Sequence, residues 1–317
     1  MTVVNSRLRQ VKTSDVDKSI VPSKDIFLDA GFPSLKGLPI IDKKTLGDYK
    51  VIKDTGFLKR HNSNPDDNLF AVSVLDRGSL EREATILRNC SGHENFPSLH
   101  GVTRIDDGEY GLVFDIPYGD DMETLSSSGE LEKFSFRERI YLALQMCGAV
   151  AYLHQNRIIH QAICPSNIII DKNTLKVTLI GFGNAFYVDD AAKPRGHGVP
   201  KYTAPETVLD NGTASFKADV WSLGMVLALL FTSLQPYHEY QPANIAKFQE
   251  IQADNQNRPR YAQTRSDNVE MKHYIGQGKA MEQVGTLINL AVCPTPELRS
   301  PAQQLLGAFA MLLTEEK

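Results

Sequence analysis

Short runs of apolar and β-branched residues, separated by polar stretches, mark the first half of the chain. Residues 49–54 and 69–76 have this composition, which predicts two strands on either side of a polar, turn-forming stretch. Residues 79–89 place apolar side chains at helical spacing, which predicts a helix with one apolar face. Residues 98–105 and 110–116 flank an Asp-Asp-Gly turn and predict a β-hairpin. We therefore expect a small sheet with one helix in this region.

Longer apolar stripes dominate the second half of the chain. Residues 134–156 carry apolar side chains on one face, and residues 217–233 are apolar on nearly all sides, which predicts two long helices, the second one buried. The remaining elements expected here are two short strands and two terminal helices, at 167–171, 176–180, 284–293 and 300–313. A sheet-rich part followed by a mainly helical part predicts an α+β protein.

The N-terminal region differs from both halves. Residues 1–45 show no sustained period and contain scattered Pro, Gly and Lys, so we expect a partly flexible extension, for which a disordered tail and a docking segment both fit. The remaining residues, 46–317, are expected to form one folded domain with a sheet-rich lobe at about 46–116 and a helical lobe at about 117–317.

Composition narrows the classes of function. Of the 317 residues, 42% are hydrophobic and 23% charged, as is usual for a globular protein with a core. The net charge of −4 gives no electrostatic reason to expect nucleic acid or an anionic membrane as a partner. The four cysteines form no CxxC pair, so we expect no zinc site and a reducing compartment, the cytoplasm or the nucleus. No apolar run is long enough to cross a bilayer, so we expect no membrane insertion.

A series of short motifs occurs in the order found in protein kinases. In chain order these motifs are FAVSVL, LVFDIPYGDDM, HQAICPSN, IGFGNA, GVPKYTAPE, KADVWSLGMVL and ELRSPAQQLL. They resemble the third-strand lysine motif, the hinge, the catalytic loop, the metal-binding segment, the end of the activation segment, the central helix and the last conserved block of that family. The resemblance covers roughly residues 48–315 and implies the bilobal protein-kinase fold, with a small β-rich N-lobe containing one helix and a larger α-helical C-lobe.

The residues that perform phosphoryl transfer in the family differ here. The resemblance places Ser73 where the phosphate-pairing lysine stands, Ala162 where the catalytic Asp stands and Gly181 where the metal-binding Asp stands. Asn167, the second metal ligand of the family, is present, but a single neutral amide is a poor Mg²⁺ site. We therefore expect no metal, and no cofactor other than ATP bound weakly without Mg²⁺.

Other positions of the expected active site are changed as well. Glu83 matches the helix glutamate but has lost its lysine partner, and Gln161 replaces the arginine that reads an activation-segment phosphate in many kinases. The glycine-rich phosphate cover has a single glycine, Gly56. Lys59 or Arg60 could replace the missing lysine, or be solvated surface cations.

Residues that shape the fold in the family are retained. By resemblance, His160 and Phe182 belong to the hydrophobic spine and Asp219 anchors it, while Glu206 and Arg299 form a buried ion pair. A vestigial adenine pocket would be lined by three apolar residues, for which an empty slot and a bound nucleotide both fit: Ala71, Phe114 and Ile169.

The retained shape and the changed chemical groups suggest a pseudokinase. We expect no enzyme, but a cytoplasmic or nuclear signalling protein that acts as a scaffold or allosteric regulator of a protein partner, such as an active kinase or a signalling complex. One alternative is a weak, metal-independent nucleotide binder. Another is a transferase with non-kinase chemistry, for which Asp171, Asp189 and Asp190 are carboxylates near the motifs in sequence.

Overall fold

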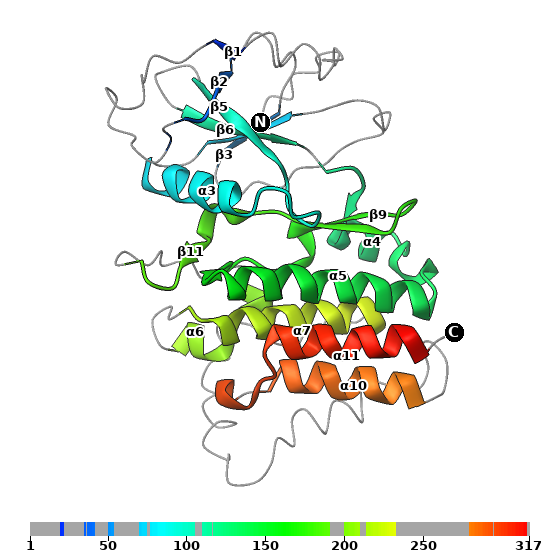
Figure 1. Cartoon of the computed structure of the whole chain (residues 1–317). Coiled ribbons are helices and arrows are strands. Elements are labelled where there is room, and N and C mark those ends of the chain that lie inside the picture. Colours follow the sequence, from blue (N-terminus) through cyan, green and yellow to red (C-terminus); the bar gives the residue numbers. More distant parts are fainter. Residues whose placement is uncertain are drawn as a thin grey trace. The chain divides into compact units, whose positions relative to one another are not determined.

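A computed structural model of the chain describes its ordered elements (Figure 1). The described residues are 20–21, 35, 37–41, 50–53, 70–74, 77–104, 110–115, 117–190, 200–209, 214–232, 279–293 and 295–315. They fall into two compact units that divide after Asp120, and Ile180–Gly183 belongs to the first unit. The main sheet lies in the first unit and the long helices in the second, which confirms the α+β class.

The first unit is built on a six-stranded sheet in the order β1-β2-β5-β6-β4-β3. Its strands are β1 Ile20–Val21, β2 Ile40–Ile41, β3 Lys50–Lys53, β4 Phe70–Val74, β5 Leu99–Arg104 and β6 Tyr110–Asp115. β6 pairs antiparallel with β5, as the hairpin pattern predicts, and the expected turn of that hairpin lies outside the described residues. β6 also pairs antiparallel with β4. β3 is parallel to β4, so these two strands are not the arms of a hairpin.

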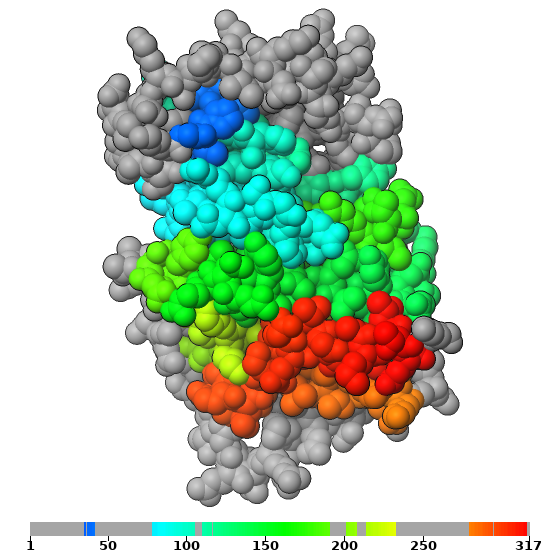
Figure 2. Space-filling model, viewed as in Figure 1, coloured from blue at the N-terminus to red at the C-terminus, as the bar shows by residue number. Residues whose placement is uncertain are grey.

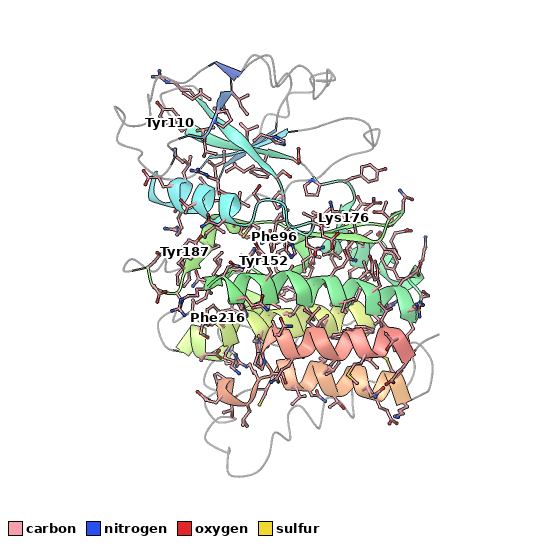
Figure 3. All side chains as sticks on the ribbon, in the orientation of Figure 1. Phe96, Tyr110, Tyr152, Lys176, Tyr187 and Phe216 are labelled. Carbon is pink, nitrogen blue, oxygen red and sulfur yellow. The ribbon has the colours of Figure 1, made fainter. Side chains whose placement is uncertain are left out.

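Helix α3, Arg77–Asn89, supplies the apolar face that the sequence predicts. Leu80, Ala84 and Leu87 are all buried. Leu80 and Ala84 share a core cluster with Val102 of β5 and with β6, and the partly buried Tyr110 of β6 packs against this cluster (Figure 3). The helix therefore closes the hydrophobic core of the first unit.

The N-terminal region also contributes to this core. Leu35 is fully buried and Leu38 nearly so, and both belong to the cluster formed by α3 and the sheet. β2 pairs with β5, and β1 pairs with β2. The described part of residues 1–45 is thus a structural part of the first unit, whereas the domain boundaries derived from the sequence stay a prediction.

The second unit is mainly helical. Its α-helices are α4 Met122–Ser127, α5 Phe136–Gln155, α6 Pro205–Leu209, α7 Phe216–Thr232, α10 Lys279–Ala291 and α11 Ala302–Glu315. The short strands are β7 Asp120–Asp121, which begins in the first unit, β8 Ile158–Ile159, β9 Ile168–Asp171, β10 Lys176–Leu179 and β11 Phe186–Tyr187. The 3₁₀ turns are η4 Leu131–Lys133, η5 Pro165–Asn167, η6 Phe182–Asn184, η7 Pro200–Tyr202 and η10 Pro296–Leu298, of which η6 begins in the first unit. Figure 2 shows α10 and α11, in orange and red, side by side at the surface of this unit.

Helix α5 begins where its sequence provides a cap. The Ser135 hydroxyl accepts a hydrogen bond from the Glu138 N–H, and the Glu138 carboxylate accepts one from the Ser135 N–H at 2.7 Å. This reciprocal pair satisfies two backbone donors at the helix start. The stripe predicted along α5 is mostly buried: Ile140, Cys147, Val150 and Ala151 are buried and Leu144 is half-buried.

Helix α7 is the most completely buried helix among those described. Every residue from Ala218 to Thr232 is buried, in agreement with the apolar pattern on nearly all sides. It packs against both α5 and α10. No helix in the described part of the chain is long and apolar enough to span a membrane.

Gly224 of α7 allows this close packing, and its substitution is a test of it. A Cβ atom at this position would lie 2.7 Å from both the Ala291 Cβ and the Val292 Cγ1 atoms. We expect Gly224→Ala to lower the free energy of unfolding by about 1–3 kcal/mol, because the two helices must shift apart. Denaturant unfolding measures this change.

Gly307 of α11 provides the matched control. A Cβ atom there would meet no atom within 4 Å. We expect Gly307→Ala to leave the stability unchanged or to raise it by up to about 1 kcal/mol, since alanine is the better helix former. Equal effects of the two substitutions would contradict the packing of α7 on α10.

Candidate active site

The loop between β8 and β9 carries the residues that resemble a catalytic loop, and the carboxylate of Asp219 fixes its start. Asp219 lies at the beginning of α7 and is 2% exposed. Its Oδ2 atom accepts a hydrogen bond from the His160 N–H at 2.8 Å, and its Oδ1 atom accepts one from the Gln161 N–H at 2.9 Å. Hydrogen bonds from backbone N–H groups to a buried carboxylate are charge-assisted and therefore strong. These bonds stabilise the backbone of Gln161, whose φ of 63° lies in the left-handed region.

Asn167 fixes the other end of the loop. Its side-chain N–H donates to the Ala162 carbonyl at 2.7 Å, and its backbone N–H donates to the Cys164 carbonyl at 3.0 Å. The Ala162 N–H in turn donates to Nδ1 of His160 at 3.2 Å, so this ring nitrogen is an acceptor. Both Asn167 and Ala162 are buried, 8% exposed each. The loop backbone is thus braced around a methyl group that can neither accept a proton nor bind a cation.

Gln161 and Tyr202 place neutral polar groups in this unit. The side-chain nitrogen and oxygen of Gln161 and the hydroxyl oxygen of Tyr202 are buried. None of these three atoms has a hydrogen-bond partner among the described residues. Burial, with smaller contributions from Glu123 and Cys164, raises the pKa of the Tyr202 hydroxyl above its ordinary value. A neutral amide cannot bind a phosphate in the bidentate way open to an arginine.

Cys164 lies in the loop that resembles a catalytic loop. It is 1% exposed, and its sulfur lies 3.3 Å from the Ser166 hydroxyl. Burial raises the pKa of the Cys164 thiol, which disfavours the nucleophilic thiolate. The residue is therefore a buried packing group.

The ion pair expected between Glu206 and Arg299 is present. The two guanidinium nitrogens Nη1 and Nη2 of Arg299 donate to the two carboxylate oxygens of Glu206 at 2.6 and 2.8 Å. Arg299 also donates to the carbonyls of Lys217 and Cys293, and its guanidinium carbon lies 4.9 Å from the centroid of the Trp221 ring. A bidentate pair with these further contacts ties α6 to α7 and to η10.

The first unit holds the remaining motif residues. Glu83 is buried in α3, and Phe114 of β6 belongs to the core cluster of this unit. The backbone of Ser73 in β4 pairs with Leu112 of β6, while the side chains of Ser73 and Ala71 lie outside the described residues. The single glycine of the phosphate cover and the two candidate cations, Gly56, Lys59 and Arg60, also lie outside them.

Gly181 and Phe182 belong to the first unit as well. Gly181 is exposed and has a φ of 85°, a backbone conformation that favours glycine. Phe182 is buried, and its ring meets that of Phe96 edge-on, with 5.5 Å between the ring centroids. Ile169, the third residue expected in the adenine pocket, is buried in β9 of the second unit.

The carboxylates considered for a different chemistry are used in local bonds. Asp171 accepts from the Asn173 N–H and the Thr174 hydroxyl at 2.9 and 2.7 Å, and Asp189 pairs with Arg157 through two bonds of 2.7 Å. Asp190 accepts from the Tyr187 N–H at 3.0 Å. Among the residues that the structure describes, no three His, Cys, Asp or Glu side chains gather as metal ligands would.

The sequence interpretation missed one residue of the loop support, His154. Its Nε2 atom lies 3.1 Å from Oδ2 of Asp219, and the centroid of its ring lies 4.8 Å from that of Phe216 at the start of α7. His154 follows Ala151 by three residues on α5 and so continues the buried stripe of that helix. A polar residue at a stripe position was the signal that could have identified it.

Comparison with known proteins agrees with this arrangement of motifs. The family model described as "Protein kinase domain" matches residues 62–308. The chain is 32% identical over 170 residues to the serine/threonine-protein kinase kin-29 of Caenorhabditis elegans, a match over 52% of this chain and 20% of the relative. It is 28% identical over 200 residues to the serine/threonine-protein kinase SIK1 of Mus musculus, with 60% and 24% covered.

A third relative is matched over more of its length. The CBL-interacting protein kinase 12 of Oryza sativa is 26% identical over 254 residues, which cover 76% of this chain and 46% of the relative. The chain thus spans between a fifth and about half the length of these three relatives.

These findings correct one expectation. The chain was expected not to be an enzyme, and this is contradicted, because its relatives are named as protein kinases and the matching model is that of a kinase domain. The physical reason is that several groups contribute to a catalytic rate, so missing side chains lower the rate without setting it to zero. Since the family model matches more than half of its residues, the chain belongs to the protein kinase domain family.

Proposed function

We propose that this protein kinase domain acts in signalling chiefly by binding a protein partner, as a scaffold or an allosteric regulator of another signalling protein such as an active kinase. The bonds from Asp219 to the backbone of His160 and Gln161 carry the proposal, because they maintain the loop while its central side chain is the methyl group of Ala162. Such a domain keeps the shape of the family's loop for a partner to bind, while the side chain at the centre of that loop has changed.

The buried ion pair supports the same proposal. Arg299 has no exposed side-chain surface, and Glu206 is largely buried with it. Removing one partner of such a pair costs about 3–5 kcal/mol, because it leaves a buried charge without compensation. The pair therefore stabilises the segment around α6 whether or not a phosphate is transferred.

Phosphoryl transfer to serine or threonine is the second candidate function. The observation that favours it is the set of relatives named serine/threonine-protein kinases. In this case the carboxylate that orients the hydroxyl has to come from a residue outside the catalytic-loop motif, since Ala162 offers no acceptor. The relatives extend well beyond the matched region, so their activity, substrates and partners apply to this chain only as a proposal.

We propose that ATP is bound weakly and without Mg²⁺. Gly181 offers no oxygen ligand from a side chain, and the oxygen that Asn167 could offer is that of a neutral amide. Mg²⁺ requires several oxygen ligands and prefers anionic ones.

We also propose that the protein resides in the cytoplasm or the nucleus and does not bind nucleic acid.

Native co-purification tests the protein-binding function. The tagged full-length chain is isolated from its own cells, and the stoichiometric partner is identified and purified for a binary binding assay. We expect the complex to form without nucleotide, and Ala162→Asp to change its Kd by less than about threefold, or ~0.65 kcal/mol. Absence of a stoichiometric partner, or a complex that forms only with Mg-ATP, would contradict the proposal.

A kinase assay on purified proteins tests the second candidate function, phosphoryl transfer. Transfer of label from [γ-³²P]ATP with Mg²⁺ or Mn²⁺ is followed for the wild type, for Asn167→Ala and for Ala162→Asp. Label incorporated by the wild type and lost in Asn167→Ala would support phosphoryl transfer. Incorporation that is equal in all three proteins would come from a contaminating kinase.

Thermal unfolding tests the nucleotide proposal. At an ATP concentration equal to its Kd, binding adds about 0.4 kcal/mol to the stability, and this corresponds to a Tm rise of roughly 0.6 °C for a chain of this size. We expect the same small rise with and without Mg²⁺. A large rise that requires Mg²⁺ would contradict the proposed metal-independent binding.

A further inference from the structure

An ion pair between Arg157 and Asp189 lies at the start of the segment that follows β11. Nε and Nη2 of Arg157 donate to the two carboxylate oxygens of Asp189, each at 2.7 Å. Both side chains are more than half exposed, and exposed pairs contribute little unless their geometry is good, as it is in this bidentate pair. The planar guanidinium therefore fixes the direction of the carboxylate as well as its distance.

The backbone around this ion pair is held by further hydrogen bonds. The Arg157 carbonyl accepts one from the Val188 N–H at 2.9 Å, directly beyond the paired strands β8 and β11. The Asp190 carboxylate accepts one from the Tyr187 N–H at 3.0 Å, and the Asp190 N–H donates to the Tyr187 carbonyl at 2.9 Å. We call these three bonds, together with the pair of Arg157 and Asp189, the Arg157 clamp.

Arg157 has an unusual backbone conformation for an arginine. It follows Asn156, the C-cap of α5, and its N–H donates to the His154 carbonyl at 3.1 Å. Its φ of 61° lies in the left-handed region, where glycine is the usual residue after a helix because other side chains are strained. Strain that a structure retains points to a role for the residue, and the guanidinium of Arg157 is bound to Asp189.

The sequence provides no hydroxyl group for phosphorylation in this segment. Residues 188–201 contain no serine, threonine or tyrosine. Gln161, which replaces a phosphate-reading arginine of many kinases, has a neutral side-chain amide. The anion that a guanidinium binds here is instead the carboxylate of Asp189, which is part of the chain and requires no modification.

We propose that the Arg157 clamp sets the start of this segment permanently, so that its conformation does not depend on phosphorylation. The Asp189 carboxylate supplies what an added phosphate would supply, an anion held by two parallel bonds from a guanidinium. The clamp connects the segment to the end of α5, where His154 contacts Asp219. The inference concerns regulation and is the same for a protein-binding domain and for a phosphoryl transferase, so it goes beyond the proposed function.

Hydrogen exchange of the full-length protein tests the clamp, with mass spectrometry on peptides that span residues 186–190. We expect exchange in Asp189→Asn to be roughly two- to fivefold faster than in the wild type, the range that a good exposed ion pair contributes. Glu130→Gln is the matched control, because it removes the same charge from another exposed pair of the second unit, with Lys133 and Lys172. It should leave exchange at residues 186–190 unchanged.

Arg157→Gly separates the clamp from general stability. Glycine adopts a φ of 61° without strain, so the Tm should stay the same or rise, while residues 186–190 exchange faster. Adding Asp189→Asn to this variant should have no further effect, because the two residues act through one pair. Unchanged exchange in both single variants would overturn the proposal, as would a fall in the Tm of Arg157→Gly with faster exchange throughout the second unit.

The independence from phosphorylation has a test of its own. Exchange at residues 186–190 is compared between the protein isolated from its own cells and the same protein after phosphatase treatment, with its mass recorded before and after. We expect identical rates whether or not the treatment removes phosphate. Faster exchange after removal of phosphate would overturn the proposal.

Discussion

A single buried carboxylate organises the centre of the second unit. Asp219 binds the backbone of His160 and Gln161 and lies within hydrogen-bonding distance of His154 on α5, so the end of α5, the loop that follows it and the distant helix α7 meet at one side chain. A carboxylate at 2% exposure is tolerated only because donors surround it. α7, which carries it, is buried along almost its whole length, and the position of the loop follows from the position of this helix.

Local patterns in the sequence were sufficient for much of the fold. The spacing of Leu80, Ala84 and Leu87 predicts which face of α3 is buried, and the uniformly apolar composition of residues 217–233 predicts a buried helix. The pairing of Glu206 with Arg299 came from the family resemblance, since no local pattern relates residues 93 positions apart. Periodicity determines the exposed and buried faces of an element, but it carries no information on the element's partners.

Non-local contacts explain what the sequence could not provide. The burial of Leu35 depends on Leu80 and Val102, which follow it by more than forty residues, and a two-residue strand such as β2 shows no measurable alternation. His154 stood on a recognisable stripe, but its contact with Asp219 appears only when α5 and α7 are placed together. The substitutions at Ser73, Ala162 and Gly181 were plain in the sequence. Their effect on a reaction rate does not follow from the sequence, because a missing group does not report what other groups contribute.

In this structure the backbone of the loop is held in place, while the side chain at its centre is the methyl group of Ala162. Asn167 contributes to the maintained loop, since its side-chain N–H donates to the Ala162 carbonyl. The ion pair of Arg299 likewise supports shape. We therefore expect that the protein's own side chains, and not a bound nucleotide, hold the loop in place.

Hydrogen exchange at the loop distinguishes these two possibilities. The amides of His160 and Gln161 donate to the Asp219 carboxylate, so their exchange reports whether those bonds persist. We expect slow exchange of both amides in the nucleotide-free protein, with no further slowing when Mg-ATP is added. Fast exchange without nucleotide that becomes slow only with Mg-ATP would contradict it.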